Sequence, residues 1–157
     1  MSNNINNFMS RAIELSIESV RSNGGPFGCV IVKNNKIIAE GCNKVTETND
    51  PTAHAEIVTI RKACKELNNF HLKGTEIYTS CEPCPMCLSA IYWAHIDKVF
   101  YGNTRKDASK IGFDDNFIYE EFSKDIGSRK IPLIQISKDE AKSAFTLWEN
   151  KPDKIEY

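Results

Sequence analysis

The sequence reads AHAE at residues 53–56 and PCPMC at residues 83–87. His54 offers an imidazole, and Cys84 and Cys87 offer two thiolates, which are typical protein ligands of zinc. Structural zinc sites are normally closed by four protein ligands, whereas catalytic sites keep one position for water. Three ligands with an adjacent carboxylate therefore indicate a catalytic zinc site that binds one Zn²⁺ per subunit.

The spacing within each segment suits this chemistry. Cys84 and Cys87 are one helical turn apart, so both sulfurs can face the same point. The exposed N–H groups at the start of a helix favour a thiolate over a thiol. Glu56 need not bind the metal, because its carboxylate can take a proton from the activated water and hand it to the leaving group. Cys81 and His71 are the nearest spare donors, and neither completes a second closely spaced pair.

Together the two segments match the H-x-E…P-C-x-x-C signature of zinc-dependent deaminases. A thioredoxin-type redox pair at Cys84 and Cys87 would leave the upstream His-x-Glu unexplained. A non-catalytic zinc-binding interaction module is a remote alternative, since it would need a fourth protein ligand and would give Glu56 no role.

Composition and charge disfavour several other classes of protein. The 157 residues fit one domain, with a formal charge of −1 and a pI of about 6.3. A chain that grips nucleic-acid backbones is usually more basic. The longest apolar run, at 90–94, is too short to span a membrane, and residues 1–10 lack a signal-peptide core. We therefore expect a cytoplasmic protein with reduced cysteines, of which Cys29, Cys42 and Cys64 are small core residues.

Hydrophobic periodicity and turn residues predict alternating helices and strands. An Asn34-Asn35 turn joins two β-type runs, at 28–32 and 36–40, into a hairpin, and residues 46–51 are expected to form a polar loop. Such alternation favours an α/β fold with one sheet covered by helices on both faces. The other expected elements are helices at 8–20, 53–67, 86–94 and 139–150, and strands at 75–79, 98–101 and 131–137.

At the zinc motif the chain resembles the cytidine-deaminase-like zinc deaminase superfamily, and the resemblance runs from the first expected helix to at least Asp115. It implies a three-layer α/β/α sandwich with a central five-stranded mixed sheet. Within the superfamily, the flanking sequence is most similar to that of the bacterial guanine deaminases. The stretches that carry this similarity are GGPFG at 24–28, NDPTAHAE at 49–56, YTSCEPCPMC at 78–87, IYWA at 91–94, GFDD at 112–115 and EY at 156–157.

The resemblance implies a role for each matching residue. His54, Cys84 and Cys87 bind zinc, and Glu56 is the proton shuttle. Around a purine base, one amide hydrogen-bonds the ring, two aromatic side chains pack on it, and a carboxylate meets the amino group at C2. The amide is that of Asn43, the aromatic residues are Phe27 and Trp93, and the carboxylate is Asp115. Ala55 also contacts the substrate, and Tyr157 closes the pocket.

Simpler roles fit the same substrate-binding residues. Aromatic side chains are commonly core residues, as Phe27 and Trp93 would then be. Asn43 suits a turn at the end of a strand, and Asp115 suits a helix cap or a solvated position. Tyr157 stands at a chain end, where order is often low.

The reaction implied by the resemblance is the hydrolysis of guanine to xanthine and ammonia, with zinc-bound hydroxide attacking C2 and Glu56 moving the proton. A tRNA adenosine deaminase is an alternative that would need a basic surface, yet residues 138–157 carry more acidic than basic side chains. A cytosine or cytidine deaminase is separated from guanine deaminase only by the flanking sequence. The resemblance also implies a homodimer in which the single domain at 1–157 passes its C-terminal segment to its partner.

Overall fold

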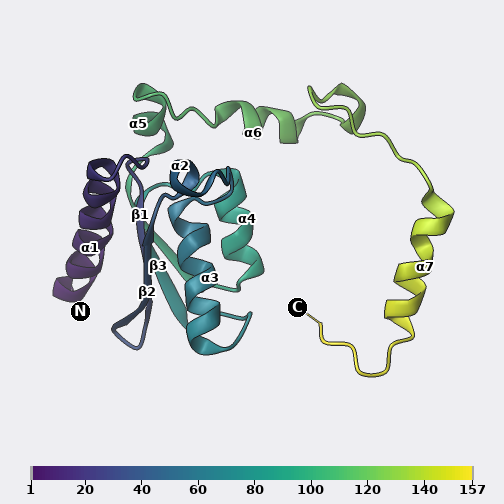
Figure 1. The fold of residues 1–157 in the computed structure, drawn as a ribbon, viewed down its shortest axis with the longest axis horizontal. Coiled ribbons are helices and arrows are strands. Elements are labelled where there is room, and N and C mark those ends of the chain that lie inside the picture. Colours follow the sequence, from purple (N-terminus) through teal and green to yellow (C-terminus); the bar gives the residue numbers. More distant parts are fainter. Residues whose placement is uncertain (1, 157) are drawn as a thin grey trace. The chain divides into compact units, whose positions relative to one another are not determined.

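A computed structural model describes residues 2–156 of the chain and contains a mixed sheet (Figure 1). Its strands are β1 (Gly28–Lys33), β2 (Lys36–Cys42), β3 (Thr75–Cys81) and β4 (Lys98–Asn103), in the order β2-β1-β3-β4. β1 pairs antiparallel with β2 and β3, and β3 pairs parallel with β4. The two inner strands are therefore β1 and β3, and β3 leads directly into the PCPMC segment.

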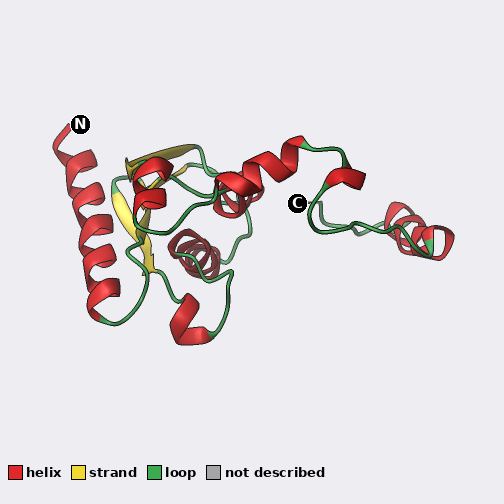
Figure 2. Cartoon of the chain, turned by 90° about the horizontal axis from the view of Figure 1, so that it is seen from above, coloured by secondary structure: helices red, strands yellow, loops and turns green. Residues whose placement is uncertain are grey.

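Helices cover both faces of this sheet (Figures 1 and 2). α1 (Ser2–Arg21) packs on one face, and α3 (Ala55–Leu67) and α4 (Pro85–Trp93) pack on the other. The three-layer α/β/α arrangement expected from the sequence is present. Both faces of β1 are buried because its side chains alternate between the two helical layers. Val30 and Val32 belong to the core under α1, and Cys29 and Ile31 belong to the core under α3.

Every element expected up to β4 is present, although the first helix begins six residues before its expected start at residue 8 and the other ends differ by one or two residues. The helix expected at 139–150 is also present, shifted by one residue. The β1–β2 turn places Asn34 at φ 50° and Asn35 at φ 60°, the left-handed conformation that a two-residue hairpin of this type needs. The segment expected to be a polar loop contains the short helix α2 (Val45–Thr48). After β4 come α5 (Arg105–Lys110), α6 (Asn116–Ser123), a 3-10 helix (Ile126–Ser128) and α7 (Lys138–Glu149).

The strand expected at 131–137 is wrong, so the sheet of the described residues has four strands and not five. A strand exists only where its backbone pairs with a neighbour, and these residues form no ladder with β1–β4. Pro132 also lacks the N–H that a ladder requires. The apolar side chains that suggested a buried strand are exposed instead, Ile131 at 76% and Ile134 at 80%.

The chain forms two units, one up to Asp115 and one from Asn116 on. The first holds the sheet, α1–α5 and both cores. In the second, α6, the 3-10 helix and α7 bury no side chain. Its large exposed apolar residues include Phe117, Phe122, Ile131, Ile134, Phe145 and Leu147. In the part of the chain that the structure describes, no helix combines the length and apolar character needed to cross a membrane.

We expect Gly28→Ala to lower the free energy of unfolding by about 2–3 kcal/mol, because α1 lies directly on this residue. A Cβ at Gly28 would lie 2.2 Å from the carbonyl oxygen of Ala12 and 2.5 Å from the amide nitrogen of Ser16, and a helix backbone cannot move aside locally. Urea unfolding of the zinc-loaded protein measures the effect. Gly127→Ala is the matched control, since its Cβ would meet nothing within 4 Å. Equal unfolding free energies for the two variants would contradict this packing.

Candidate active site

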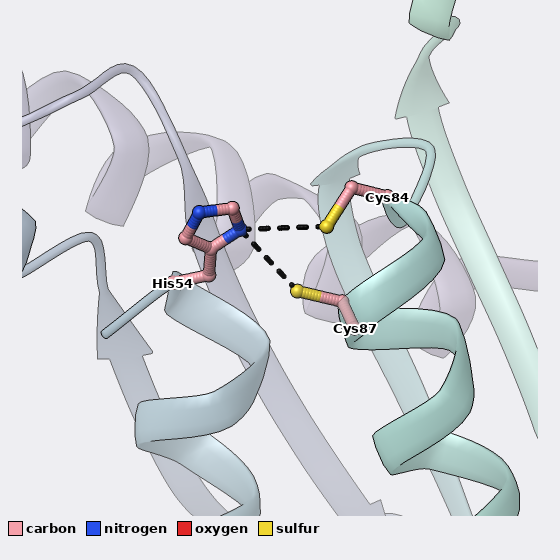
Figure 3. Close-up of side chains that lie close together, drawn as sticks. All are labelled: His54, Cys84 and Cys87. Atoms are coloured by element: carbon pink, nitrogen blue, oxygen red, sulfur yellow. Dashed lines mark hydrogen bonds between the residues drawn. The ribbon is translucent and has the colours of Figure 1, made fainter. Parts of the chain in front are cut away.

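The starts of α3 and α4 bring the two halves of the zinc motif together (Figure 3). His54 is the N-cap residue of α3, and Cys84 is the N-cap residue of α4. Both have the extended backbone that precedes a helix, with ψ of 157° and 168°. Pro85 begins α4, where its fixed φ is already helical and its missing N–H has no intrahelical partner to lose. Cys87 follows in the first turn, so both sulfurs face His54.

The separation of these three side chains fits a tetrahedral zinc ion. The Nδ1 atom of His54 lies 3.5 Å from the sulfur of Cys84 and 3.5 Å from that of Cys87. All three ligand atoms lie within 4.8 Å of one another. Nitrogen and sulfur donors on a tetrahedral zinc ion are about 3.6 Å apart, given bond lengths of about 2.0–2.3 Å. Among the described residues no fourth donor joins this group, which is the donor set of a catalytic rather than a structural site.

The charge state of the two cysteines also suits metal binding. A hydrogen bond from Cys87, together with the nearby His54, lowers the pKa of the Cys84 thiol to about 4. The same bond to Cys84 and burial raise the pKa of the Cys87 thiol. The hydrogen bond with Cys84 raises the pKa of His54. Cys84 therefore favours the thiolate form, and Cys87 would have to release its proton to bind a metal.

Glu56 lies beside this group in the first turn of α3, and its carboxylate is buried. One oxygen, Oε1, accepts a hydrogen bond of 3.1 Å from the hydroxyl of Thr79. The other, Oε2, accepts one of 3.4 Å from the sulfur of Cys87. Burial raises the pKa of the Glu56 carboxyl above its usual value. A carboxyl with a raised pKa next to a metal-ligand group is suited to carry a proton in both directions.

Asn43 and Phe27 lie together beside the end of β2. The backbone N–H of Asn43 donates to the carbonyl of Phe27 at 3.0 Å, and its side-chain Oδ1 accepts from Val45 N at 3.2 Å. A Cβ on Gly25 would touch both residues, at 3.2 Å from the Asn43 amide carbon and 3.3 Å from the Phe27 ring. Asn43 is buried. The GGPFG stretch therefore brings a polar amide and an aromatic ring to one place.

The GFDD stretch reaches the same part of the first unit. Phe113 packs edge-on against Phe27, with ring centroids 4.9 Å apart. Asp115 is half-buried, and burial followed by the negative charge of Cys84 raises the pKa of its carboxyl. Asp115 thus lies within electrostatic range of the metal-ligand group. Phe113 was not among the residues expected at the site, because its position is decided by a ring contact across the chain.

The three other expected substrate residues are Trp93, Ala55 and Tyr157. Trp93 ends α4, about 13 Å along the helix from Cys84, and is 66% exposed, so the structure does not bring it to the metal-ligand group. Ala55 is fully buried directly after His54. Tyr157 lies outside the described residues. The substrate-binding roles of these residues stay predictions.

The remaining cysteines and His71 lie outside the metal-ligand group. Cys81 is buried with its sulfur 3.7 Å from the carbonyl of Thr104, and the ring of His71 packs against that of His95. Cys29, Cys42 and Cys64 lie in or against the two cores. All six cysteines lie in the described residues and none of them forms a disulfide, as expected.

The family model for the cytidine and deoxycytidylate deaminase zinc-binding region matches residues 2–103. The chain belongs to this family of zinc-binding deaminases. It is 54% identical over 151 residues to guanine deaminase of Bacillus subtilis (strain 168), which covers 96% of this chain and 97% of the relative. The X-ray structure of guanine deaminase from Bacillus subtilis matches the fold with a TM-score of 0.94 and 53% identity, over 97% of this chain and 98% of that chain.

A second group of relatives matches this deaminase over a shorter stretch. The tRNA-specific adenosine deaminase of Agrobacterium fabrum is 43% identical over 94 residues, which is 57% of this chain and 62% of that protein. The match to guanine deaminase, in contrast, runs through almost the whole length of both chains.

We expect Cys84→Ser and Cys87→Ser to weaken zinc binding by more than about 100-fold, because even the loss of an outer partner of a ligand commonly costs 10–100-fold. Zinc content after dialysis against a competing chelator measures this loss. Cys64→Ser is the control, since its sulfur lies near the carbonyl of Phe70 and outside the ligand group. Wild-type zinc content in Cys84→Ser would show that the group in Figure 3 is not the metal site.

Proposed function

We propose that this protein hydrolyses guanine to xanthine and ammonia. The observation that carries the proposal is the match to guanine deaminase over 96% of the chain, combined with a His54–Cys84–Cys87 group that has a buried glutamate beside it. The reaction replaces the amino group at C2 with oxygen from water. It therefore needs an activated water, a group that carries protons, and contacts that present C2 of the base.

The metal group and Glu56 meet the first two needs. His54, Cys84 and Cys87 would hold zinc, which lowers the pKa of a bound water toward neutrality. Glu56 accepts one proton from the attacking water and delivers it to the ring nitrogen next to C2 as the C2–O bond forms. It then takes the remaining proton from the hydroxyl on C2 and gives it to the amino group, which leaves as ammonia when the C2–N bond breaks. The distance of 3.4 Å between its Oε2 atom and the sulfur of Cys87 supports this role, because it puts the carboxylate next to a metal-ligand residue.

We infer that Asn43, Phe27 and Asp115 present the base. The amide of Asn43 offers a donor and an acceptor to the purine edge, and the ring of Phe27 offers an apolar surface. The carboxylate of Asp115 accepts from the amino group at C2, because a carboxylate suits an N–H donor. The electrostatic influence of Cys84 on Asp115 supports their placement at one site.

The unit from Asn116 on supports a homodimer. Its helices bury no side chain, and it exposes large apolar residues such as Ile134 and Phe145. Such a surface is normally covered by another protein surface. We infer that the single domain at 1–157 exchanges this segment with a second copy, and that Trp93 and Tyr157 serve sites completed in the dimer. The six free thiols support a cytoplasmic location.

A tRNA adenosine deaminase is the second candidate, favoured by relatives such as that of Agrobacterium fabrum. The zinc chemistry would be the same, but the substrate would be an adenosine extruded from RNA. The formal charge of −1 supplies no general attraction for a polyanion. The shorter match and this charge place the tRNA reaction second.

Ammonia release from guanine, adenine, cytosine and cytidine tests the substrate. We expect kcat/KM for guanine to exceed that for each other compound by about 100-fold or more, because a site built for one pattern of hydrogen bonds leaves buried groups unpaired with another. Turnover of a different base would retain the zinc chemistry and overturn the assignment of the pocket. Activity on tRNA alone would favour the second candidate.

We expect Glu56→Gln to lower kcat for guanine by about 100- to 10,000-fold while zinc content stays unchanged, because an amide cannot accept and return the proton. Steady-state kinetics and metal analysis on the same preparation measure both quantities. Glu66→Gln, on the exposed side of the same helix, is the control and should retain wild-type kcat. A Glu56→Gln variant with wild-type kcat would remove Glu56 from the mechanism.

A further inference from the structure

Thr79 is a buried polar residue that the family motif does not use. It lies in β3, an inner strand, and is fully buried. Its neighbours in the sheet are Cys29 on β1 and Tyr101 on β4. The backbone of Thr79 is therefore held by strands on both sides.

The hydroxyl of Thr79 donates to Oε1 of Glu56 at 3.1 Å. A hydroxyl buried without a hydrogen bond is costly, and a strand residue has its own carbonyl and N–H already engaged in the ladder. The contact joins two elements, β3 and α3, that come from different parts of the chain. It therefore fixes a side chain on the helix to a point in the sheet.

The two oxygens of Glu56 have different surroundings. Oε2 lies 3.4 Å from the sulfur of Cys87, which belongs to the metal-ligand group, whereas Thr79 belongs to no such group. With Oε1 held by the strand, the free rotation of the carboxylate is removed and Oε2 is directed at the ligand group. Proton transfer needs this orientation, because a displacement of about 1 Å can cost about 100-fold in rate.

We propose that Thr79 is a positioning residue for the deamination, which acts by holding Oε1 of Glu56 so that Oε2 faces the reacting atoms. This proposal rests on the role proposed for Glu56. Thr79 touches neither the substrate nor the metal ligands in this account. Its contribution should appear in kcat, which depends on the orientation of the shuttle, and not in KM or in zinc content.

The test compares three substitutions with a matched control. Thr79→Val keeps the shape of the side chain and replaces the hydroxyl with a methyl group. Thr79→Ala removes both the hydroxyl and the methyl group, and Thr79→Ser keeps the hydroxyl and removes the methyl group. Thr75→Val is the control, because Thr75 is equally buried in the same strand and donates to the carbonyl of Leu72 instead. For each variant we would measure kcat, KM for guanine, zinc content and the unfolding midpoint.

We expect Thr79→Val and Thr79→Ala to lower kcat by about 10- to 100-fold, the usual effect of removing an outer hydrogen-bond partner of a functional group. KM should change by less than about threefold, which is less than the loss of a substrate hydrogen bond would give. Thr79→Ser should recover most of kcat, and Thr75→Val should keep it. Wild-type kcat in both Thr79→Val and Thr79→Ala would overturn the proposal. A Thr79→Ser variant as slow as Thr79→Val would also overturn it, because a hydroxyl at this position would then not restore kcat.

Two further measurements separate this proposal from the proposed function. Absence of guanine turnover in the wild type would refute the function, whereas loss of activity in Glu56→Gln with full activity in Thr79→Val would refute only the role of Thr79. A crystal structure of Thr79→Val gives a readout that does not depend on turnover. We expect the Glu56 carboxylate to leave its present orientation there, and an unchanged orientation would contradict the positioning role.

Discussion

The contact of His54 with the sulfurs of Cys84 and Cys87 joins the N-terminal ends of α3 and α4, which are about 30 residues apart in the sequence. Each helix start is held from the sheet side, since α3 and α4 pack on the face opposite α1 and share one core with β1 and β3. A side chain at a helix start moves with the helix axis, so small rotations of either helix would separate the donors. The core between the two helices and the sheet therefore determines whether a metal can bind. The close contact of α1 with Gly28 serves the same end from the other face.

Burial couples the charges of the site to one another. Glu56 and Cys87 are buried, and Asp115 is partly so. In such surroundings charges are poorly screened, and each ionised group changes the proton affinity of the next one. The sulfur of Cys84 illustrates this, because it influences His54, Glu56 and Asp115 together. The site is best described as one coupled set of groups, in which a change of charge at the metal is felt by both the shuttle and the residue proposed to meet the amino group.

The parts of the site that the sequence predicted are those that depend on local chain geometry. Cys84 and Cys87 are a helical turn apart wherever a helix begins there, and the Asn34-Asn35 turn needs only its own two residues. The family signature predicted that His54 joins these two cysteines, whereas other features that depend on distant partners were missed. The stretch at 131–137 has the composition of a strand, yet composition cannot supply a neighbouring strand. Thr79 looks like any strand threonine until α3 places Glu56 opposite its hydroxyl. Phe113 likewise becomes notable only through its contact with Phe27.

The helices of the unit that begins at Asn116 bury none of their own side chains. Conformational entropy opposes the ordering of such a segment at roughly 1–2 kcal/mol per residue, and without burial little within the segment compensates for it. Its order then follows mass action, so that the ordered fraction rises with the concentration of whatever surface covers it. Dilution of that surface then lowers the ordered fraction of the segment, as heating or denaturant would. Under the proposed exchange of this segment with a second copy, two preparations of one sequence would differ in the state of the segment when their protein concentrations differ.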